Sequence, residues 1–574
     1  MSGFTGLIAF KDSILTESNK IKFPDYANRF YPKLESICGQ SYCFFYYGNR
    51  RLYQAPLIRS SLSNIFGLEG VFLNKQIEEL ERKIEIDRGE LQPPVEFLNT
   101  LKTTHGSFSG FNYNKSSQEL FLFTDQTSSR QIFYYSGNDL FAFSSSIFLL
   151  CDLLRQLKIK PTLNEPASYM ILSLGYFIKD YTLVNEIKKL EAGKYLIVNA
   201  KSTIIKEYHN YFMPVLHNKI TRDLIDELDT RFRRSIEMEY QYDLNKGLKH
   251  IATLSGGLDS RMNLMVAWEN GFKEITALTF SEGMHPDELV ARKISNDLKI
   301  EHIIIPLNNG LHLFDIDTPL LLNNCAVYYF GAPQTLTAVR KLNFNNFGLL
   351  HNGNLAESSK GSYLSVPEHI YPQLSKRSSV SDKLFDRVQS LFKNEIAGSY
   401  PNEEMFGHYS RAFNAAHNGS WMTRPFAESV YTFMEPNFAE LAYSISPKLR
   451  YNSFLTIEWL LTLHPKWADY NWATKGIPPT NNPGKKIIYR LISKLGRMIS
   501  GNDPSPFPLN RWFESNDRLR KFVNENYNNS NAWSIIPVEI KKDVDMLFRT
   551  GTINEKMLCL SYLKSLDLLF LIMN

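Results

Sequence analysis

The sequence is poor in the features that mark several protein classes. It contains only five cysteines, at positions 38, 43, 151, 325 and 559, and their spacing matches no metal-binding pattern. We therefore expect reduced cysteines in a cytoplasmic protein. The start of the chain lacks a basic segment followed by an apolar one, and the apolar stretch Leu566 to Met573 is far shorter than a membrane span. Neither a secreted nor a membrane-spanning protein is indicated.

Neither basic nor acidic residues are in large excess over the other. The formal net charge is +5 over 574 residues, which is too weak to argue for a nucleic acid partner, and we expect none. The length predicts more than one domain. A hydrophobic content of 43% and an aromatic content of 13% fit well-packed globular domains.

The most informative stretch that is present reads Leu-Ser-Gly-Gly-Leu-Asp-Ser-Arg, residues 254–261. An apolar strand-like segment precedes it and a helix-like segment, 262–268, follows it. Gly256 and Gly257 allow a sharp turn that brings backbone N–H groups close to a ligand. The unpaired N–H groups at a helix start suit an anion. Ser255 and Ser260 add hydroxyl donors, so the pattern predicts an anion-binding turn.

An acid inside this turn indicates that a cation accompanies the anion. Asp259 is most simply explained by Mg²⁺ bound together with phosphates. The stretch lacks the Gly-Lys-Ser/Thr ending of a Walker loop. It resembles the PP-loop of ATP pyrophosphatases, and Ser-Gly-Gly-Leu-Asp-Ser is the form seen in the asparagine synthetase family. The resemblance implies ATP and Mg²⁺ as cofactors, cleavage between the α and β phosphates, adenylation of a carboxylate and formation of an amide.

Strand-like and helix-like segments alternate after the turn. Residues 274–281 and 300–307 are typical of buried strands, and 287–294 is typical of a helix with acids in its first turn. This alternation predicts a doubly wound parallel sheet, in which ligands bind beyond the carboxyl ends of the strands. By the resemblance, the adenosine borders Leu254 and the segment Leu278–Ser281 near these strand ends, with Leu278, Thr279 and Ser281 as the binding residues.

A second glycine loop, residues 349–364, resembles the second ATP-side loop of the family and contains Gly353. Glu357 falls on the acid that joins Asp259 in binding Mg²⁺, where the family usually has Asp. Asn354 falls where authentic asparagine synthetases and β-lactam synthetases have a Glu involved in amide formation. Asn cannot take a proton from an attacking amine, and this departure weakens the case for asparagine as the product.

Segments 424–428, 445–452 and 464–478 follow the order of the C-terminal helical part of asparagine synthetase relatives. They are most similar to the branch associated with bacterial surface polysaccharides. In the family, a lysine before the last glycine of this region reaches the leaving pyrophosphate. Lys475 is its counterpart here, and a cation there would neutralise charge on the leaving group.

Short β-type segments with turn signals dominate the chain up to about residue 210. Their order resembles the N-terminal glutaminase domain of class II amidotransferases, an Ntn-hydrolase-like αββα sandwich. In that family a Cys after the initiator Met is the nucleophile, whereas Ser2 stands there in this sequence. Glu69 replaces the Asn of the family's Asn-Gly pair. We therefore expect a retained but inactive glutaminase domain, although an N-terminal Ser does serve some hydrolases of this fold.

Together the patterns predict an α/β protein with two domains and an extension. Residues 1–210 form the glutamine amidotransferase-like domain, and 211–480 form a PP-loop ATP pyrophosphatase domain of the asparagine synthetase type. Residues 481–574 form a helical C-terminal extension. Within it, 485–499 is a basic amphipathic stretch that can lie on an anionic membrane surface, but we expect it to pack on the domain core.

The hypothesis from the sequence is an ATP-dependent amide-forming ligase. The acceptor is a small-molecule, glycan or peptide carboxylate, such as aspartate or a uronic acid. The nitrogen comes from free ammonia, another subunit or an amine on the substrate, and a homodimer is compatible with the resemblance. Two alternatives stay open. One is an intramolecular amide-forming cyclase of the β-lactam or lasso-peptide synthetase type. The other is a nucleotide-binding scaffold without catalysis, motivated by the changes at Ser2, Glu69 and Asn354.

Overall fold

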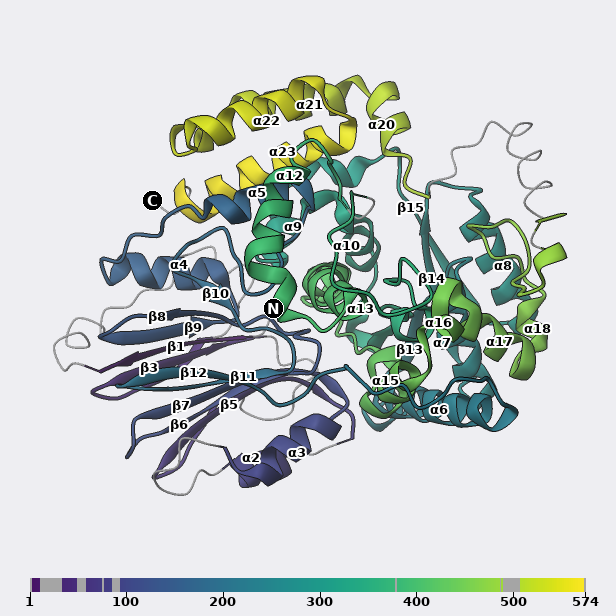
Figure 1. Ribbon diagram of the computed structural model, residues 1–574, viewed down its shortest axis with the longest axis horizontal. Helices are drawn as coiled ribbons and strands as arrows, with labels where there is room; N and C mark the ends of the chain where they lie inside the picture. Colours follow the sequence, from purple (N-terminus) through teal and green to yellow (C-terminus); the bar gives the residue numbers. More distant parts are fainter. Residues whose placement is uncertain are drawn as a thin grey trace.

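The computed structural model describes residues 3–10, 34–48, 58–74, 77–84, 93–376, 379–485, 487–488 and 506–571. Ser2 and most of the amphipathic stretch 485–499 lie outside the described residues, so the predictions for them stay predictions. An antiparallel β-sandwich lies beside a parallel sheet with helices, and the C-terminal helices lie above both (Figure 1).

Two six-stranded antiparallel sheets make up the sandwich. In spatial order, the strands of the first sheet are β10 (Lys188–Lys189), β8 (Phe133–Ser136), β9 (Leu140–Ser144), β1 (Gly3–Ala9), β3 (Tyr42–Tyr47) and β2 (Leu34–Cys38). Those of the second are β12 (Ser202–Glu207), β11 (Lys194–Asn199), β7 (Glu119–Thr124), β6 (Gly106–Asn114), β5 (Asn64–Phe72) and β4 (Ile58–Ser60).

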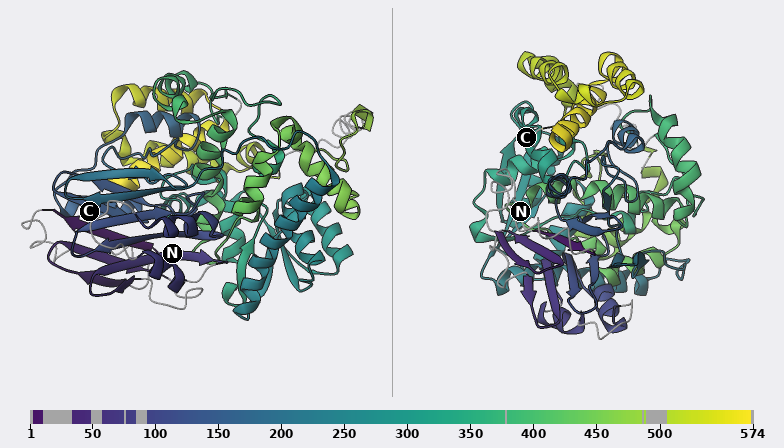
Figure 2. Two further views of the ribbon diagram at one scale, coloured as in Figure 1. Left: turned by 60° about the horizontal axis from the view of Figure 1, so that its bottom comes forward. Right: turned by 90° about the vertical axis from the view of Figure 1, so that its left-hand side faces the viewer.

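Helices cover both outer faces of the sandwich. Phe4, Phe44 and Phe111 pack in the core between the sheets, with ring centroids of neighbouring pairs 4.8–5.2 Å apart. Helices α2 (Ile77–Ile84) and α3 (Val95–Thr103) pack on the second sheet. Helices α4 (Ile147–Gln156) and α5 (Glu165–Ser173) share a core with the outer face of the first sheet. The predicted αββα layering is confirmed for these residues (Figures 1 and 2).

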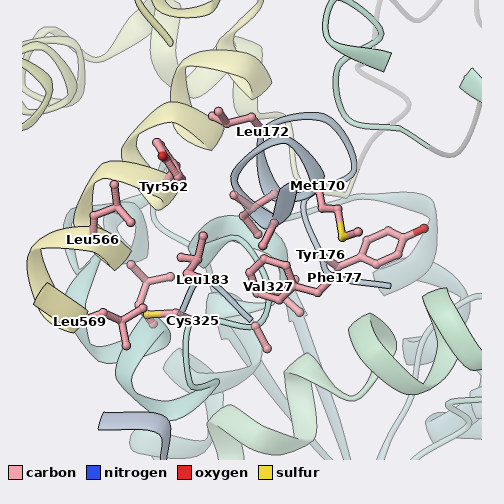
Figure 3. Packing of buried hydrophobic residues seen from close by; sticks show 14 of the residues in the cluster. Met170, Leu172, Tyr176, Phe177, Leu183, Cys325, Val327, Tyr562, Leu566 and Leu569 are labelled. Atoms are coloured by element: carbon pink, nitrogen blue, oxygen red, sulfur yellow. The ribbon is translucent and has the colours of Figure 1, made fainter. Parts of the chain in front are cut away.

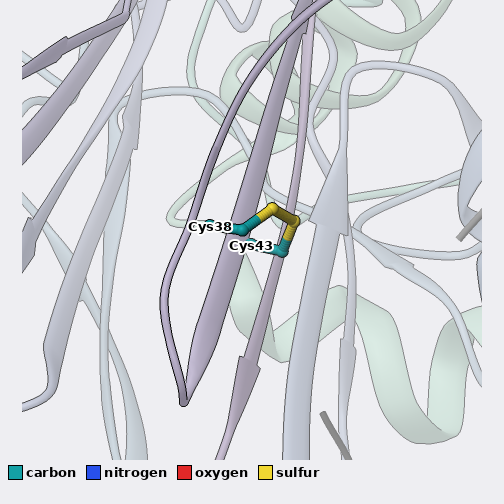
Figure 4. Close-up of a disulfide and its surroundings, with 2 residues drawn as sticks. All are labelled: Cys38 and Cys43. Carbon is teal, nitrogen blue, oxygen red and sulfur yellow. A yellow bond between two sulfur atoms is a disulfide. The ribbon is translucent and has the colours of Figure 1, made fainter. Parts of the chain in front are cut away.

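A disulfide joins Cys38 and Cys43 across the hairpin of β2 and β3 (Figure 4). The register of the two strands places these residues directly opposite each other. The prediction that all five cysteines are reduced is therefore wrong for this pair, because spacing alone did not reveal that a tight hairpin aligns them. Cys151, Cys325 and Cys559 are free and buried.

The third sheet has four parallel strands in the order β15 (Glu301–Pro306), β14 (Ile275–Ser281), β13 (Lys249–Thr253) and β16 (Phe347–His351). Ala252 and Ala277 face helices α6 (Arg222–Asn245), α7 (Leu258–Glu269) and α8 (Pro286–Leu298). Ile251 and Leu278 face the opposite side, towards α10 (Pro333–Arg340). Helices on both faces of a parallel sheet are the predicted doubly wound arrangement.

The strand order reverses at β13. From β13 the chain passes through α7 to β14 and through α8 to β15, and it later returns to the other side of β13 as β16. The loops after β13 and β16 therefore diverge at this point and leave a crevice at the carboxyl ends of the strands.

Further helices pack around this sheet and towards the sandwich. They are α9 (Asp317–Leu322), α11 (Glu357–Lys360), α12 (Phe385–Leu391), α13 (Glu403–Gly407), α14 (Asn418–Thr423), α15 (Pro436–Ser444), α16 (Pro447–Arg450), α17 (Phe454–Leu463) and α18 (Pro465–Ala468). Among the helices that the structure describes, none is both long enough and apolar enough to cross a membrane.

The C-terminal helices are built into the main core. They are α20 (Leu509–Ser515), α21 (Asp517–Asn528), α22 (Val538–Thr550) and α23 (Ile553–Leu566). Tyr562 and Leu566 of α23 pack with Met170 of α5 and with Val327 in one buried cluster (Figure 3). The hydroxyl of Tyr562 donates a hydrogen bond to Ser168 Oγ over 3.1 Å. One hydrophobic core thus joins residues from the first third, the middle and the end of the chain.

A buried ionic network ties the sandwich to the parallel sheet. His351, at the end of β16, has its Nε2 2.8 Å from Asp243 Oδ2 and its Nδ1 3.4 Å from Glu239 Oε2, both on α6. Its ring stacks on Tyr240 with centroids 3.8 Å apart. Glu239 also lies 3.4 Å from Nε2 of His105, which precedes β6 in the sandwich. Burial alone would lower the pKa of His351, but Asp243 and Glu239 outweigh burial and raise it to about 9.

We predict that this network gives the fold a pH-dependent stability. Because the pKa of His351 is raised from its ordinary value, the stabilisation is fully present below about pH 6.5 and is lost as the pH rises through about 9. The difference in free energy of unfolding between the wild type and His351→Gln should therefore shrink by about 2–3 kcal/mol from near pH 7 to near pH 9.5. Urea unfolding at the two pH values measures this difference.

His302→Gln serves as the matched control. Burial lowers the pKa of His302 to about 4, so this side chain stays neutral across the tested range. Its substitution should shift stability by the same amount at both pH values. A difference in free energy of unfolding between wild type and His351→Gln that is the same at both pH values would contradict the assignment of a charged His351.

Candidate functional site

A cavity of about 340 Å³ lies at the carboxyl ends of β13, β14 and β16, where the strand order reverses. Polar side chains from α10 and α14 face it, including Thr335 and Thr423. Gly256, Ser281, Glu357 and Lys475 are described by the structure but are not among its lining residues. Eight residues predicted from the sequence do line it: Leu254, Ser255, Gly257, Asp259, Ser260, Leu278, Thr279 and Gly353.

The glycine turn between β13 and α7 is held by hydrogen bonds to its own hydroxyls. Ser260 Oγ accepts from the backbone N–H of Ser255 over 3.1 Å and lies 2.9 Å from Ser255 Oγ. Ser255 Oγ accepts from the N–H of Gly257 over 3.2 Å. Gly257 precedes α7 and has no side chain to cap the first N–H groups of the helix. Those N–H groups lie at the end of α7 that lines the cavity, and their partial positive charge suits an anion.

Asp287, in the first turn of α8, reaches the same turn. Its Oδ1 accepts a hydrogen bond from the N–H of Gly256 over 2.9 Å. Pro286 starts α8 at a position that tolerates proline, and the ring of His285 accepts a hydrogen bond from the N–H of Asp287. The carboxylate therefore occupies an N–H group that an anion would otherwise contact, and it adds a negative charge beside the turn.

Gly353 is required by close backbone approach. A methyl group at this position would lie 2.3 Å from the carbonyl carbon of Asp259 and 2.4 Å from the amide nitrogen of Ser260. Such distances are too short for any side chain, so the loop after β16 can press against the start of α7 only with glycine there. The two glycine loops that the sequence singled out are thus in direct contact.

Two acids and a lysine meet beside this contact. Asp259 Oδ2 forms an ion pair with Lys360 Nζ over 2.7 Å. Asp259 Oδ1 and Glu357 Oε2 are buried and accept no hydrogen bond from any residue that the structure describes. Burial and the charge of Asp259 raise the pKa of Glu357, against the opposing effect of Lys360. Burial would lower the pKa of Lys360, but Asp259 outweighs burial and raises it.

These two acids fit a magnesium ion. Mg²⁺ prefers carboxylate and phosphate oxygens as ligands. The two unsatisfied oxygens supply such atoms, and a divalent cation between them would relieve the mutual repulsion that raises the pKa of Glu357. The acids belong to the loops joined at Gly353, so the sequence-predicted pair is brought to one place.

A buried arginine fixes the glycine turn against a distant segment. Arg261, on α7, donates to the backbone carbonyls of Gly256, Tyr470 and Asn471 over 2.6–3.3 Å. The carbonyl of Gly256 also accepts from the N–H of Ala473 over 3.0 Å, and a methyl group on Gly256 would collide with Ala473. The loop that carries Lys475 is therefore anchored to the turn.

Lys475 itself points its charge outwards. Its side chain is exposed, and its Nζ lies 5.5 Å from the centre of the Trp472 ring. The structure places this lysine two residues from the contact with Gly256 but not in the cavity wall.

The residues predicted to border the adenosine differ in their roles. The hydroxyl of Thr279 donates to the carbonyl of Leu254 over 2.6 Å, so it holds the turn to β14. Leu278 is fully buried, and its carbonyl accepts from the N–H of Leu254. Ser281 is also buried and caps the N–H of Gly283 rather than facing the cavity. Asn354 is exposed, and its backbone N–H donates to Asn352.

A buried chain of ion pairs lies in the sandwich around Glu69. Glu69 accepts hydrogen bonds from Ser109 over 2.8 Å and from Ser145 over 3.0 Å, beside strand β1. Arg130 lies 3.7 Å from Glu69 and 2.5 Å from Glu428, and both Glu69 and Arg130 are fully buried. Burial raises the pKa of Glu69 in spite of Arg130. Glu428 precedes Ser429, which lines the cavity.

Sequence reasoning missed several residues of this site, and Asp287, Lys360 and Phe507 are the ones that the argument uses. Asp287 follows the strand end at Ser281 by only a few residues, and acids in the first turn of a helix at that edge were the available signal. Lys360 lies in the second glycine loop, where a lysine three residues after an acid is on the same helix face. Phe507, which lines the cavity from the C-terminal part of the chain, gave no signal because nothing in its neighbourhood resembles a motif.

Comparisons with known proteins cover parts of the chain. Residues 98–209 match the family model of a glutamine amidotransferase domain. A protein of Methanocaldococcus jannaschii named "Putative asparagine synthetase (glutamine-hydrolyzing) 2" is 24% identical over 212 residues. The match covers 36% of this chain and 39% of that protein, so the chain spans about two fifths of the length of this curated relative.

Two solved structures also match at low identity. "Structure of the allosteric regulatory enzyme of purine biosynthesis" is 11% identical with a TM-score of 0.22, over 53% of this chain and 74% of that chain. The glutamine phosphoribosylpyrophosphate amidotransferase from B. subtilis, complexed with ADP and GMP, is 10% identical with a TM-score of 0.20, over 52% and 75%. The chain thus contains a segment that matches a glutamine amidotransferase domain and is similar, at low identity, to a putative asparagine synthetase, in line with the resemblance that the motifs indicate.

Proposed function

We propose that the protein is an ATP-dependent amide-forming ligase, which adenylates a carboxylate and transfers the acyl group to ammonia or an amine. The observation that carries this proposal is the meeting of both glycine loops at a cavity where the strand order of a parallel sheet reverses, with Asp259 in the cavity wall and the unsatisfied Glu357 close enough to feel its charge. Such switch points are where open α/β sheets bind nucleotides. The similarity to an asparagine synthetase supports the same conclusion.

In this proposal the glycine turn binds the phosphates of ATP. The N–H groups at the start of α7 and the hydroxyls of Ser255 and Ser260 contact the phosphate oxygens. The hydrogen bonds that these hydroxyls now make to each other are exchanged for bonds to the phosphates. Arg261 and Gly353 hold the turn in shape, and Arg261 does so from outside the cavity wall.

Asp259 and Glu357 would hold Mg²⁺, which supplies charge neutralisation for the phosphates when bound. Lys360 keeps the Asp259 carboxylate oriented, because it occupies one oxygen and leaves Oδ1 without a partner among the described residues. The carboxylate of the acceptor attacks the α phosphate, and pyrophosphate leaves. Lys475 neutralises the leaving group from the loop anchored at Gly256.

The nitrogen enters as ammonia or as an amine and attacks the acyl-adenylate, releasing AMP. Asn354 offers no base at the position where relatives have a Glu, so the amine must arrive unprotonated or lose its proton to water. The buried chain of paired charges runs from Glu69 through Arg130 to Glu428, which directly precedes the cavity-lining Ser429. This arrangement supports a nitrogen source outside the sandwich.

ATP–pyrophosphate exchange with a panel of carboxylic acids tests the adenylation step. Asp259→Asn should lower the exchange rate about a hundredfold or more, because it removes a charged ligand from the magnesium site. Asp226→Asn, on the exposed face of α6, is the matched control and should exchange at the wild-type rate. ATP binding without exchange for any acid would favour the scaffold alternative. Binding and exchange that survive in Asp259→Asn would contradict the proposed site.

Lys475 is tested by separating binding from turnover. Lys475→Ala should lower the exchange rate about ten- to a hundredfold and leave the Kd of ATP within about twofold, because its charge acts on the leaving pyrophosphate. Lys466→Ala removes another exposed lysine from a nearby helix and should change neither value. An exchange rate unaffected by Lys475→Ala would remove this lysine from the mechanism.

The nitrogen source is tested with glutamine and ammonium supplied separately. We expect amide formation with ammonium or an amine and no glutamate release from glutamine, because Glu69 cannot offer the amide donor and its oxygens already contact Ser109, Ser145 and Arg130. Glutamate is measured enzymatically in wild type and in Ser2→Ala. Release in the wild type that disappears in Ser2→Ala would show a working glutaminase.

A further inference from the structure

Two aromatic rings face each other at the cavity. Phe280 lies near the end of β14, and Phe507 lies in the segment that leads into α20. Both side chains line the cavity and are half-buried. Their ring centroids are 6.4 Å apart, and the ring planes are inclined by 27°. The rings are therefore close to parallel, and one comes from a part of the chain that no motif identifies.

The spacing of the two rings is suited to a third flat ring. Paired aromatic rings in proteins have centroids about 4.5–7 Å apart, so these two lie near the outer end of that range. Stacked bases are separated by about 3.4 Å, so a base between two rings needs about 7 Å. The centroid distance of 6.4 Å is within about 1 Å of that value, so a base needs a small displacement of either side chain to enter between the rings.

The position of Phe507 is fixed by its neighbours in α20. Trp512 is almost fully buried and lies against Gly310, where a methyl group would collide with its ring. Arg511 lies 3.8 Å from Glu282, directly after β14. The carbonyl of Phe507 accepts a hydrogen bond from the N–H of Leu509 over 2.8 Å. The start of α20 is thus held at the carboxyl ends of β14 and β15, beside the cavity.

We propose that the planar base of a purine nucleotide stacks between Phe280 and Phe507, so that the C-terminal part of the chain completes the nucleotide site. This inference rests on the proposed function for the identity of the ligand as ATP. The glycine turn contacts the phosphates, and the aromatic pair contacts the base. Leu254 and Leu278 supply apolar wall between the two contacts. Stacking is tolerant of base identity, because every base has a π-face.

Binding of ATP and of pyrophosphate, measured by titration calorimetry with Mg²⁺ present, separates the base contact from the phosphate contact. Phe507→Ala should weaken ATP binding about five- to a hundredfold, the range for loss of one stacked base, and leave pyrophosphate binding within about twofold. Phe507→Trp should retain ATP binding, whereas Phe507→Leu should behave like Phe507→Ala because it keeps apolar bulk but removes the ring.

Phe513→Ala is the matched control. Phe513 is a half-buried aromatic residue of α20, the helix that directly follows Phe507, and it is not among the residues that line the cavity. Its removal should leave both affinities unchanged, and thermal unfolding of each variant checks that α20 stays folded. Phe280→Leu should reproduce the selective loss of ATP binding from the other side of the base.

The outcomes distinguish this inference from the proposed function. Wild-type protein that binds ATP while Phe507→Ala binds it equally well would overturn the stacking proposal alone. Equal weakening of ATP and pyrophosphate by Phe507→Leu would also overturn it, because a general disturbance of the site would then be the cause. Wild-type protein that binds neither ligand would overturn both proposals.

Discussion

The buried guanidinium of Arg261 is the interaction on which the shape of the cavity depends. It has no carboxylate partner among the described hydrogen bonds and donates only to backbone carbonyls, on the glycine turn and on the segment around Tyr470. Burial lowers the pKa of Arg261 to about 10, which still leaves the side chain charged at neutral pH. The two terminal nitrogens make these bonds and Nε has no partner among the described residues, so moving either segment would leave more of the buried guanidinium unsatisfied. The turn is therefore rigid before any ligand arrives.

A second buried arginine plays a comparable part at the boundary with the sandwich. Arg130 contacts Glu69 on one side and Glu428 on the other, and the segment after Glu428 forms a wall of the cavity. A carboxylate at position 69 would be costly in a pocket that has to receive an uncharged amide, but it is well placed to hold an arginine. By the resemblance, relatives have an Asn at this position, so Glu69 makes a structural ion pair where they have an uncharged amide.

Much of the fold was predictable because it depends on local patterns. The alternation of apolar segments and glycine turns predicted β13, α7, β14, α8 and β15, and the parallel sheet then required their loops to meet at one edge. The sequence could not show which side chains meet within that edge. The pairing of Lys360 with Asp259 joins residues 101 positions apart, and the contact of Arg261 with Tyr470 joins residues 209 apart. The disulfide between Cys38 and Cys43 depended on hairpin register, which residue spacing does not reveal. The domain boundaries and the roles of the site residues stay predictions.

The C-terminal helices were predicted as an extension because their sequence shows little beyond helical periodicity. In the structure, α23 shares its buried face with α5 and with the segment around Val327, so removing it would expose core side chains from two other regions. The start of α20 is then positioned by the packing of its side chains in this core. The ring of Phe507 is consequently held beside that of Phe280 by the packing of the core. The cavity is formed by three parts of the chain: residues 253–287, residues 335–429 and the segment 506–507.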